Sequence, residues 1–205
     1  QTGRMPEQGL RLLVYDRDAR GLGWAWAAGA RWYRARGWLD RARGAASWGE
    51  ALEFLETVLP ARRVAEIQFW GHGKWGDARF GAERLERAWL ERGHPHGDRL
   101  RRVARRFDPG GLLWFRSCET LGARAGRELA RALSSELGCR VAGHTYVIDL
   151  LQSGLHALSP GAEPDWDERE GILEGTPERP LRALRSSANA PRTITCFEGR
   201  LPDWA

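Results

Sequence analysis

The chain has few cysteines, a single lysine (Lys74) and no long hydrophobic run. Three cysteines are too few, and odd in number, for a disulfide scaffold. They form no CxxC pair, and His94-Pro95-His96 reads as a loop, so no metal site is predicted. Without a run of about 18 apolar residues, no membrane span is expected. The first residues lack the charged start and apolar middle of a secretory signal, which favours a cytoplasmic location.

Arginine and tryptophan are abundant instead. Lys and Arg together number 32 against 27 Asp and Glu, giving a net charge of +5. The basic residues are dispersed among acidic ones, which predicts a solvated mixed-charge surface rather than a nucleic-acid partner. The 205 residues, 42% of them hydrophobic, fit one globular domain over 1–205, with a core at roughly 10–160 and a loop-rich segment at 160–205. Four tryptophans are expected to pack a core or a surface helix: Trp24, Trp26, Trp32 and Trp38.

Apolar strands alternate with helical patterns along most of the chain. Ser47 and Glu50 form a capping box that starts one helix, and Gly138 ends another. Asp108 to Gly111 is a turn signal, and residues 160–180 are turn-rich with room for a hairpin. This order predicts an α/β fold with a mainly parallel sheet. Strands are predicted at 10–15, 64–70, 112–115, 140–142 and 194–197, and helices at 24–36, 47–59, 82–92, 99–107 and 123–137.

Chemically competent side chains follow four of the predicted strands. Asp16, His72, Cys118 and His144 each come at or just after a strand end. Ligand sites of parallel α/β sheets form at the carboxyl ends of the strands. We therefore expect these four residues, distant in sequence, to meet along one edge of the sheet.

A thiol beside an imidazole is a nucleophile with its base. Cys118 stands between a strand and a helix start, where backbone N–H groups favour a thiolate or an oxyanion. His72 is surrounded by glycines, which let a substrate backbone approach. The amides of Gly73 and Cys118 are candidate oxyanion donors. Each residue also has a structural interpretation, Cys118 as a buried small side chain and His72 as a turn residue.

Two segments carry a family resemblance. IQFWGHGKWGDARFG, around His72, resembles the strand-His-Gly segment of caspases, gingipains and related peptidases. LLWFRSCETLG, around Cys118, resembles their strand-small residue-Cys segment, and the separation of 46 positions (72 to 118) is close to the caspase-type value of about 50. GRELARALSSELGCRVAGHTY continues the likeness, which covers roughly residues 10–160 and is closest to uncharacterised bacterial caspase-like domains of surface or secreted proteins.

The resemblance implies a caspase-like three-layer sandwich and a cysteine endopeptidase. It makes Cys118 the nucleophile and His72 the general base and acid. It implies no metal for the chemistry, although calcium activates some relatives, and the acidic residues from Asp165 to Glu170 are a weak candidate site for it. The partners implied are a protein or peptide substrate and a regulatory protein. The caspase pentapeptide around the cysteine is absent, so a preference for cleavage after Asp is not implied.

Four residues are candidates for substrate binding. In relatives specific for Arg or Lys, an acidic residue after the first strand lines the primary pocket, and Asp16 stands at the matching place with Asp18 nearby. Cleavage after basic residues is therefore the expected preference. Both aspartates could instead cap the following turn. Glu119, next to the nucleophile, and His144, at the same edge, are further candidates, with His144 also interpretable as a satisfied loop residue.

Two other functions compete with the peptidase. Cys118 to Arg124 fits the Cys-x5-Arg spacing of cysteine-dependent phosphatases, whose loop cradles phosphate. Glu119 within that loop would repel phosphate, and the pattern leaves the His72 segment unexplained. The second alternative is a catalytically inactive or partner-gated caspase-like interaction module, against which the presence of both His72 and Cys118 argues.

Overall fold

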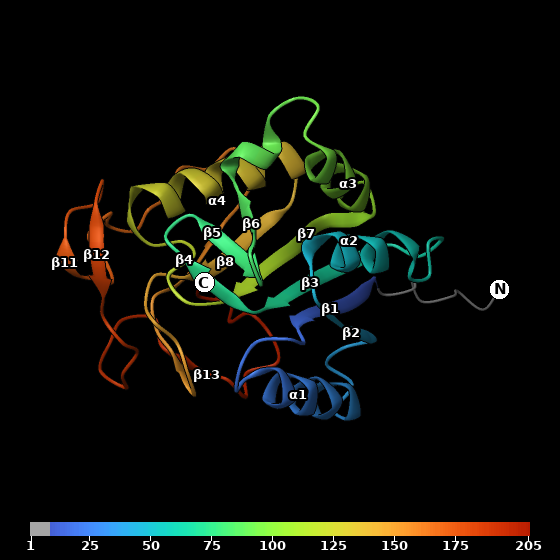
Figure 1. The fold of residues 1–205 in the computed structure, drawn as a ribbon, viewed down its shortest axis with the longest axis horizontal. Helices are drawn as coiled ribbons and strands as arrows, with labels where there is room; N and C mark the ends of the chain where they lie inside the picture. The colour runs from blue at the N-terminus through green and yellow to red at the C-terminus, as the bar shows by residue number, and fades with distance from the viewer. Residues whose placement is uncertain (1–8) are drawn as a thin grey trace.

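The computed structural model describes residues 9–205, which fold around one six-stranded sheet (Figure 1). The order across the sheet is β10-β8-β7-β3-β1-β2. All neighbours pair in parallel except β10, which runs antiparallel to β8. The predicted α/β class with a mainly parallel sheet is confirmed. The strands are β1 (Leu10–Asp16), β2 (Arg41–Ala45), β3 (Val64–Trp70), β7 (Phe107–Arg116), β8 (Arg140–His144) and β10 (Leu155–Leu158).

Helices cover both faces of the sheet. Figure 1 shows α1 (Gly23–Ala35) on one face, and α2 (Trp48–Thr57), α3 (Pro95–Ala104) and α4 (Ala123–Leu137) on the other. The Ser47 hydroxyl accepts the Glu50 amide N–H at 3.1 Å, so the predicted cap of α2 is present. Gly138 ends α4 with a φ of 63°, a left-handed conformation that glycine adopts without steric cost.

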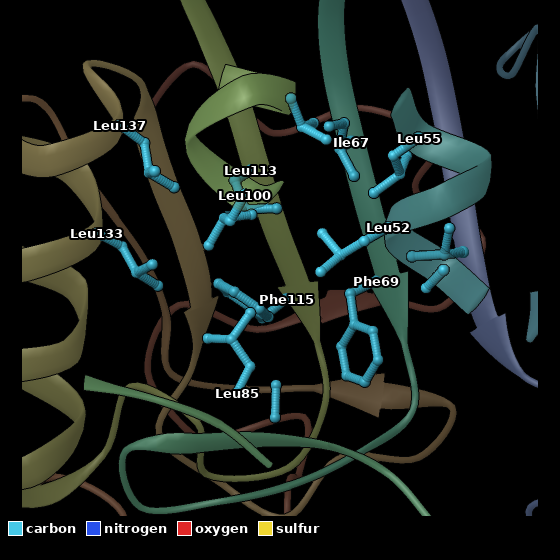
Figure 2. Close-up of a cluster of buried hydrophobic side chains, with 14 of the residues drawn as sticks. Leu52, Leu55, Ile67, Phe69, Leu85, Leu100, Leu113, Phe115, Leu133 and Leu137 are labelled. Carbon is cyan, nitrogen blue, oxygen red and sulfur yellow. The ribbon is translucent and has the colours of Figure 1, made fainter. Parts of the chain in front are cut away.

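The main core lies between the sheet and the three helices α2, α3 and α4. Figure 2 shows apolar side chains from all three helices and from the strands converging there. Burial of each large side chain contributes about 1.5–3 kcal/mol before entropy is counted, so this layer fixes the helices on the sheet. A smaller cluster on the opposite face joins α1 to the sheet through Tyr33, Leu13 and Trp70.

The segment after His72 differs from its prediction. Residues 72–86 form an antiparallel sheet of β4 (His72–Lys74), β5 (Asp77–Phe80) and β6 (Glu83–Glu86), followed by the 3-10 helix η1 (Arg87–Leu90). The predicted helix at 82–92 is therefore wrong. Pairing with β5 overrides the local helical pattern because it buries Leu85 in the main core and brings the Glu83 carboxylate within 2.7 Å of the Trp48 amide.

Other boundaries also differ. The helix predicted at 99–107 is α3, which begins at Pro95 and ends at Ala104. The Asp108 to Gly111 turn is an irregularity within β7, where Val64 pairs with Phe107 and Glu66 with Leu112. The last strand, β13 (Ile194–Thr195), pairs with β9 (Leu151–Gln152), and a hairpin of β11 (Ile172–Gly175) and β12 (Pro180–Ala183) occupies the loop-rich segment.

Candidate active site

A cavity of about 580 Å³ opens at the carboxyl ends of β3 and β7. Helix α1 forms one wall, and the segments 148–152 and 196–197 form another. His72, just beyond β3, and Cys118, just beyond β7, both line it. Because β3 and β7 are parallel neighbours in the sheet, they deliver the two residues to the same opening.

The Cys118 sulfur contacts a loop backbone. It lies 3.4 Å from the amide nitrogen of Ile148, which donates to it, and 3.7 Å from the Ile148 carbonyl oxygen. Burial raises the pKa of the Cys118 thiol, although the Ile148 N–H opposes this effect. The resting side chain is therefore a neutral thiol at neutral pH and needs a base before it can attack.

His72 is exposed at the start of β4, and its ring makes a T-shaped contact with Trp26 at a centroid distance of 5.7 Å. Within residues 9–205, no hydrogen bond joins His72 to Cys118. The fold thus brings the two predicted residues to one cavity while the thiol keeps its contact with Ile148. Catalytic hydrogen bonds are often long in ligand-free enzymes and form only with substrate.

The turn that carries Cys118 packs against Gly73. A Cβ atom on Gly73 would clash with Thr120 Oγ1 and lie 2.8 Å from the Cys118 carbonyl oxygen, closer than real contacts allow, with Ser117 Oγ at 3.0 Å. Ser117 and Thr120 share a hydrogen bond of 2.6 Å, which closes the turn. In the part of the chain that the structure describes, the Cys118 amide N–H has no protein acceptor, so this predicted oxyanion donor is free to bind.

Sequence reasoning missed Arg116, which lies at the floor of the cavity. Its guanidinium is buried against the Trp114 ring, 4.5 Å from the ring centre. It donates one hydrogen bond to the Tyr33 hydroxyl at 2.6 Å. It donates two more to the side-chain oxygen of Gln152, at 2.8 and 3.0 Å. The carbonyl oxygens of Glu198 and Thr195 accept at 2.8 and 3.3 Å. An arginine that ends an apolar strand two residues before the cysteine was the available signal.

All of these acceptors are uncharged oxygens. Among residues 9–205, no carboxylate lies within ion-pair distance of it. Burial lowers the pKa of Arg116, yet an arginine keeps its proton in proteins. A desolvated positive charge therefore lies beneath the cavity.

Asp16 and Asp18 lie apart from the cavity. Asp16 is buried and accepts the amide N–H groups of Asp18 at 3.0 Å and Gly81 at 3.3 Å. It ties the turn after β1 to the β5–β6 connection, which is the capping interpretation of this residue. Asp18 is exposed and lies 3.7 Å from Arg17. Neither carboxylate lines the cavity that holds Cys118.

Glu119 and His144 are buried beside the site without lining it. Burial raises the pKa of Glu119, although Lys74 and Arg79 oppose it, and its Oε2 atom has no hydrogen-bond partner among residues 9–205. The His144 Nδ1 lies 3.1 Å from the Ser153 carbonyl oxygen. Burial lowers the pKa of His144 to about 3, with the Arg116 charge acting in the same direction. His144 is therefore a neutral structural residue at neutral pH.

Arg124 does not have the position that the phosphate-binding alternative requires. Arg124 is exposed and paired with Glu178 and Glu168 rather than turned to the Cys118 sulfur. The acidic segment proposed for calcium is likewise engaged elsewhere, since Glu170 binds His156 at 2.7 Å. In the described chain, no group of three or more His, Cys, Asp or Glu residues could hold a metal ion.

Comparison of the chain with models of known protein families, with characterised proteins and with solved structures gave no match. None of the helices between residues 9 and 205 is long and apolar enough to cross a membrane.

Proposed function

We propose that this protein is a cysteine endopeptidase of caspase-like fold, with Cys118 as nucleophile and His72 as general base and acid. The observation that carries the proposal is that both side chains line one cavity at the ends of two adjacent parallel strands. The pairing of β3 with β7, and not the sequence next to either residue alone, brings the two side chains together. A thiol and an imidazole in one substrate-sized cavity supply the nucleophile and the general base that acyl transfer requires.

The proposed reaction has two halves. His72 takes the proton of the Cys118 thiol, and the thiolate attacks the scissile carbonyl carbon. The Cys118 amide, whose N–H lacks a protein acceptor in the described chain, and the Gly73 amide stabilise the oxyanion. His72 then gives its proton to the leaving amine, and a thioester remains. Water, deprotonated by His72, hydrolyses the thioester and restores the thiol.

Substrate must change the resting contacts before the first step. The sulfur binds Ile148, and burial raises the thiol pKa. A substrate backbone that enters the cavity would have to displace the 148–150 segment from the sulfur and bring His72 within hydrogen-bond reach. This requirement is the specific observation that favours the second candidate function, a partner-gated or inactive interaction module in which a regulatory protein controls that segment.

The proposal does not rest on a basic cleavage preference. That expectation depended on Asp16, whose carboxylate faces backbone amides away from the cavity. The three cysteines are all free thiols, which suits a reducing compartment, and we retain the cytoplasm as the proposed location.

Covalent labelling tests the proposal. Peptidyl acyloxymethyl ketones with several different terminal residues would be incubated with wild type, Cys118→Ala, His72→Ala and Cys196→Ser, and adducts counted by intact mass. Cys196 lines the same cavity and is the matched control. One adduct on wild type and on Cys196→Ser, absent from the other two variants, supports the dyad. Labelling that survives in His72→Ala contradicts it, and no labelling by any probe favours the gated module.

A further inference from the structure

The walls of the cavity are mainly aromatic and aliphatic. Helix α1 contributes Trp26, Trp32 and Tyr33, β3 contributes Trp70, and the last segment of the chain contributes Phe197. Several of these side chains remain accessible although they are large and apolar, with 39% of Trp32 and 59% of Phe197 exposed. Leu150, 67% exposed, lies at the same opening. Large apolar side chains gathered around a cavity mark a binding site for an apolar group.

The charges of the cavity disfavour a basic ligand. Arg116 places an unneutralised, desolvated positive charge at the floor, where a low dielectric makes repulsion of a second cation strong. Asp149 is the one carboxylate among the residues described as lining the cavity, and it lies 3.3 Å from Arg185, a cation on the same rim. A lysine or arginine side chain would therefore enter toward Arg116 without a free carboxylate to meet it.

An acidic ligand would be attracted by the same charge but is poorly matched to the hydrogen-bond donors of Arg116. The guanidinium of Arg116 has five N–H groups, and its Nε, Nη1 and Nη2 atoms already donate to protein oxygens. A substrate carboxylate would lose its hydration and find no unoccupied donor on that group. Its cost of burial would remain only partly offset.

We propose that this cavity binds a large apolar side chain, aromatic or leucine-like, of the residue whose carbonyl Cys118 attacks. The inference rests on the proposed function for its geometry, since Cys118 and His72 border the same opening. Arg116 then has two roles. It fastens the walls of the cavity together through Tyr33 and Gln152, and its charge excludes basic side chains.

The first experiment compares four acyloxymethyl ketones that share one peptide and end in Phe, Leu, Arg or Asp. We expect Cys118 to be labelled at least about tenfold faster by the Phe and Leu probes than by the others. Faster labelling by the Arg or the Asp probe overturns this inference and leaves the peptidase proposal standing.

A pair of variants on α1 locates the binding site. Ala25 lines the cavity, whereas Ala28 is exposed on the same helix and does not line it. Ala25→Trp should fill the cavity and slow labelling by the Phe probe about tenfold or more, while Ala28→Trp leaves the rate unchanged. Equal rates in the two variants, with helix content confirmed by circular dichroism, place the side chain elsewhere and overturn the inference.

A binding measurement separates this inference from failure of the proposed chemistry. N-acetylated peptide amides ending in Phe or Arg would be titrated into Cys118→Ala by calorimetry. Tighter binding of the Phe peptide, lost in Cys118→Ala combined with Ala25→Trp, supports the apolar site even when no probe labels Cys118. No difference between the two peptides overturns it.

Discussion

The guanidinium of Arg116 donates two hydrogen bonds to the side-chain oxygen of Gln152, 3.0 Å from Nε and 2.8 Å from Nη2. This contact joins the end of β7 to β9, and the bond from Arg116 to the Tyr33 hydroxyl joins both to α1. The cavity walls come from parts of the chain more than 100 residues apart. Arg116 thus connects β7 to both β9 and α1, so it holds the walls in place.

Replacing Arg116 should therefore destabilise the fold. Arg116→Lys keeps the charge but offers one ammonium in place of a planar fork, so buried acceptors lose their donors. We expect the free energy of unfolding to fall by roughly 2–4 kcal/mol, measured by urea denaturation. Arg102→Lys is the control, because Arg102 is half exposed and, within residues 9–205, forms its ion pair with Glu56 at the surface. It should cost less than about 1 kcal/mol. Equal losses in both variants would contradict the role assigned to Arg116.

The reactivity of the cysteines with pH gives a second prediction. Burial raises the pKa of the Cys118 thiol. The rate of its alkylation by iodoacetamide should therefore reach half its maximum at a pH above about 8.5, the usual pKa of a free thiol. Cys139 is buried with a pKa raised to about 12 and should stay unlabelled in the folded protein. Peptide mapping by mass spectrometry reports each site.

The same experiment tests the resting geometry. Because no hydrogen bond joins His72 to Cys118 in the described structure, His72→Ala should leave the alkylation midpoint of Cys118 unchanged. A wild-type midpoint below about 8.5 that rises in His72→Ala would show that a thiolate–imidazolium pair already exists without substrate.

Local patterns sufficed for much of the fold. The apolar runs of β1, β3 and β7, and the capped helices α2 and α4, were predicted because each carries its own period or cap. The edge strand β2, with the sequence RARGA, was missed because it has no apolar run and is held by pairing with β1. The helix predicted at 82–92 failed for a related reason, since β6 is defined by its partner β5.

The candidate site was likewise predictable only in the part formed by strands with their own apolar pattern. His72 and Cys118 follow strands whose parallel order the alternating pattern predicts, so their meeting at one opening could be anticipated. The opposite wall comes from residues 148–152, for which no helix or strand was predicted, and from residues 196–197, near the end of the loop-rich segment. Their docking depends on Arg116, whose place at the end of an apolar strand was the available sign of its burial in a chain rich in arginine. The prediction that Asp16 lines a substrate pocket failed for a similar reason. The Gly81 amide that binds its carboxylate belongs to the β5–β6 hairpin, which was not predicted.

Gly73 supports a third prediction. A methyl group at this position would clash with Thr120 Oγ1 and the Cys118 carbonyl oxygen, so Gly73→Ala should displace the turn that carries the nucleophile. We expect labelling of Cys118 by the peptidyl probes to fall at least about tenfold, and stability to fall by about 1–3 kcal/mol. Gly49→Ala in α2 is the control, since its Cβ would make only ordinary contacts at 3.6 Å or more. It should leave labelling unchanged and cost no stability. Normal labelling in Gly73→Ala would show that the approach of Gly73 does not position Cys118.

His144 makes the stability of the fold depend on pH. Its pKa is lowered to about 3 in the folded protein from 6.5 in a model peptide. Between these values the unfolded chain binds a proton that the folded chain excludes, so this contribution is complete above pH 6.5 and is lost as the pH falls. At pH 5 the loss should be about 2 kcal/mol relative to pH 7.

Urea unfolding of wild type and His144→Gln at pH 7 and pH 5 isolates this effect, because the other titrating groups are common to both proteins. The variant should be less stable than wild type at pH 7, since it disturbs the contact with Ser153, but should lose about 2 kcal/mol less between the two pH values. If His144→Gln keeps the wild-type dependence instead, the imidazole of His144 is not held neutral by burial.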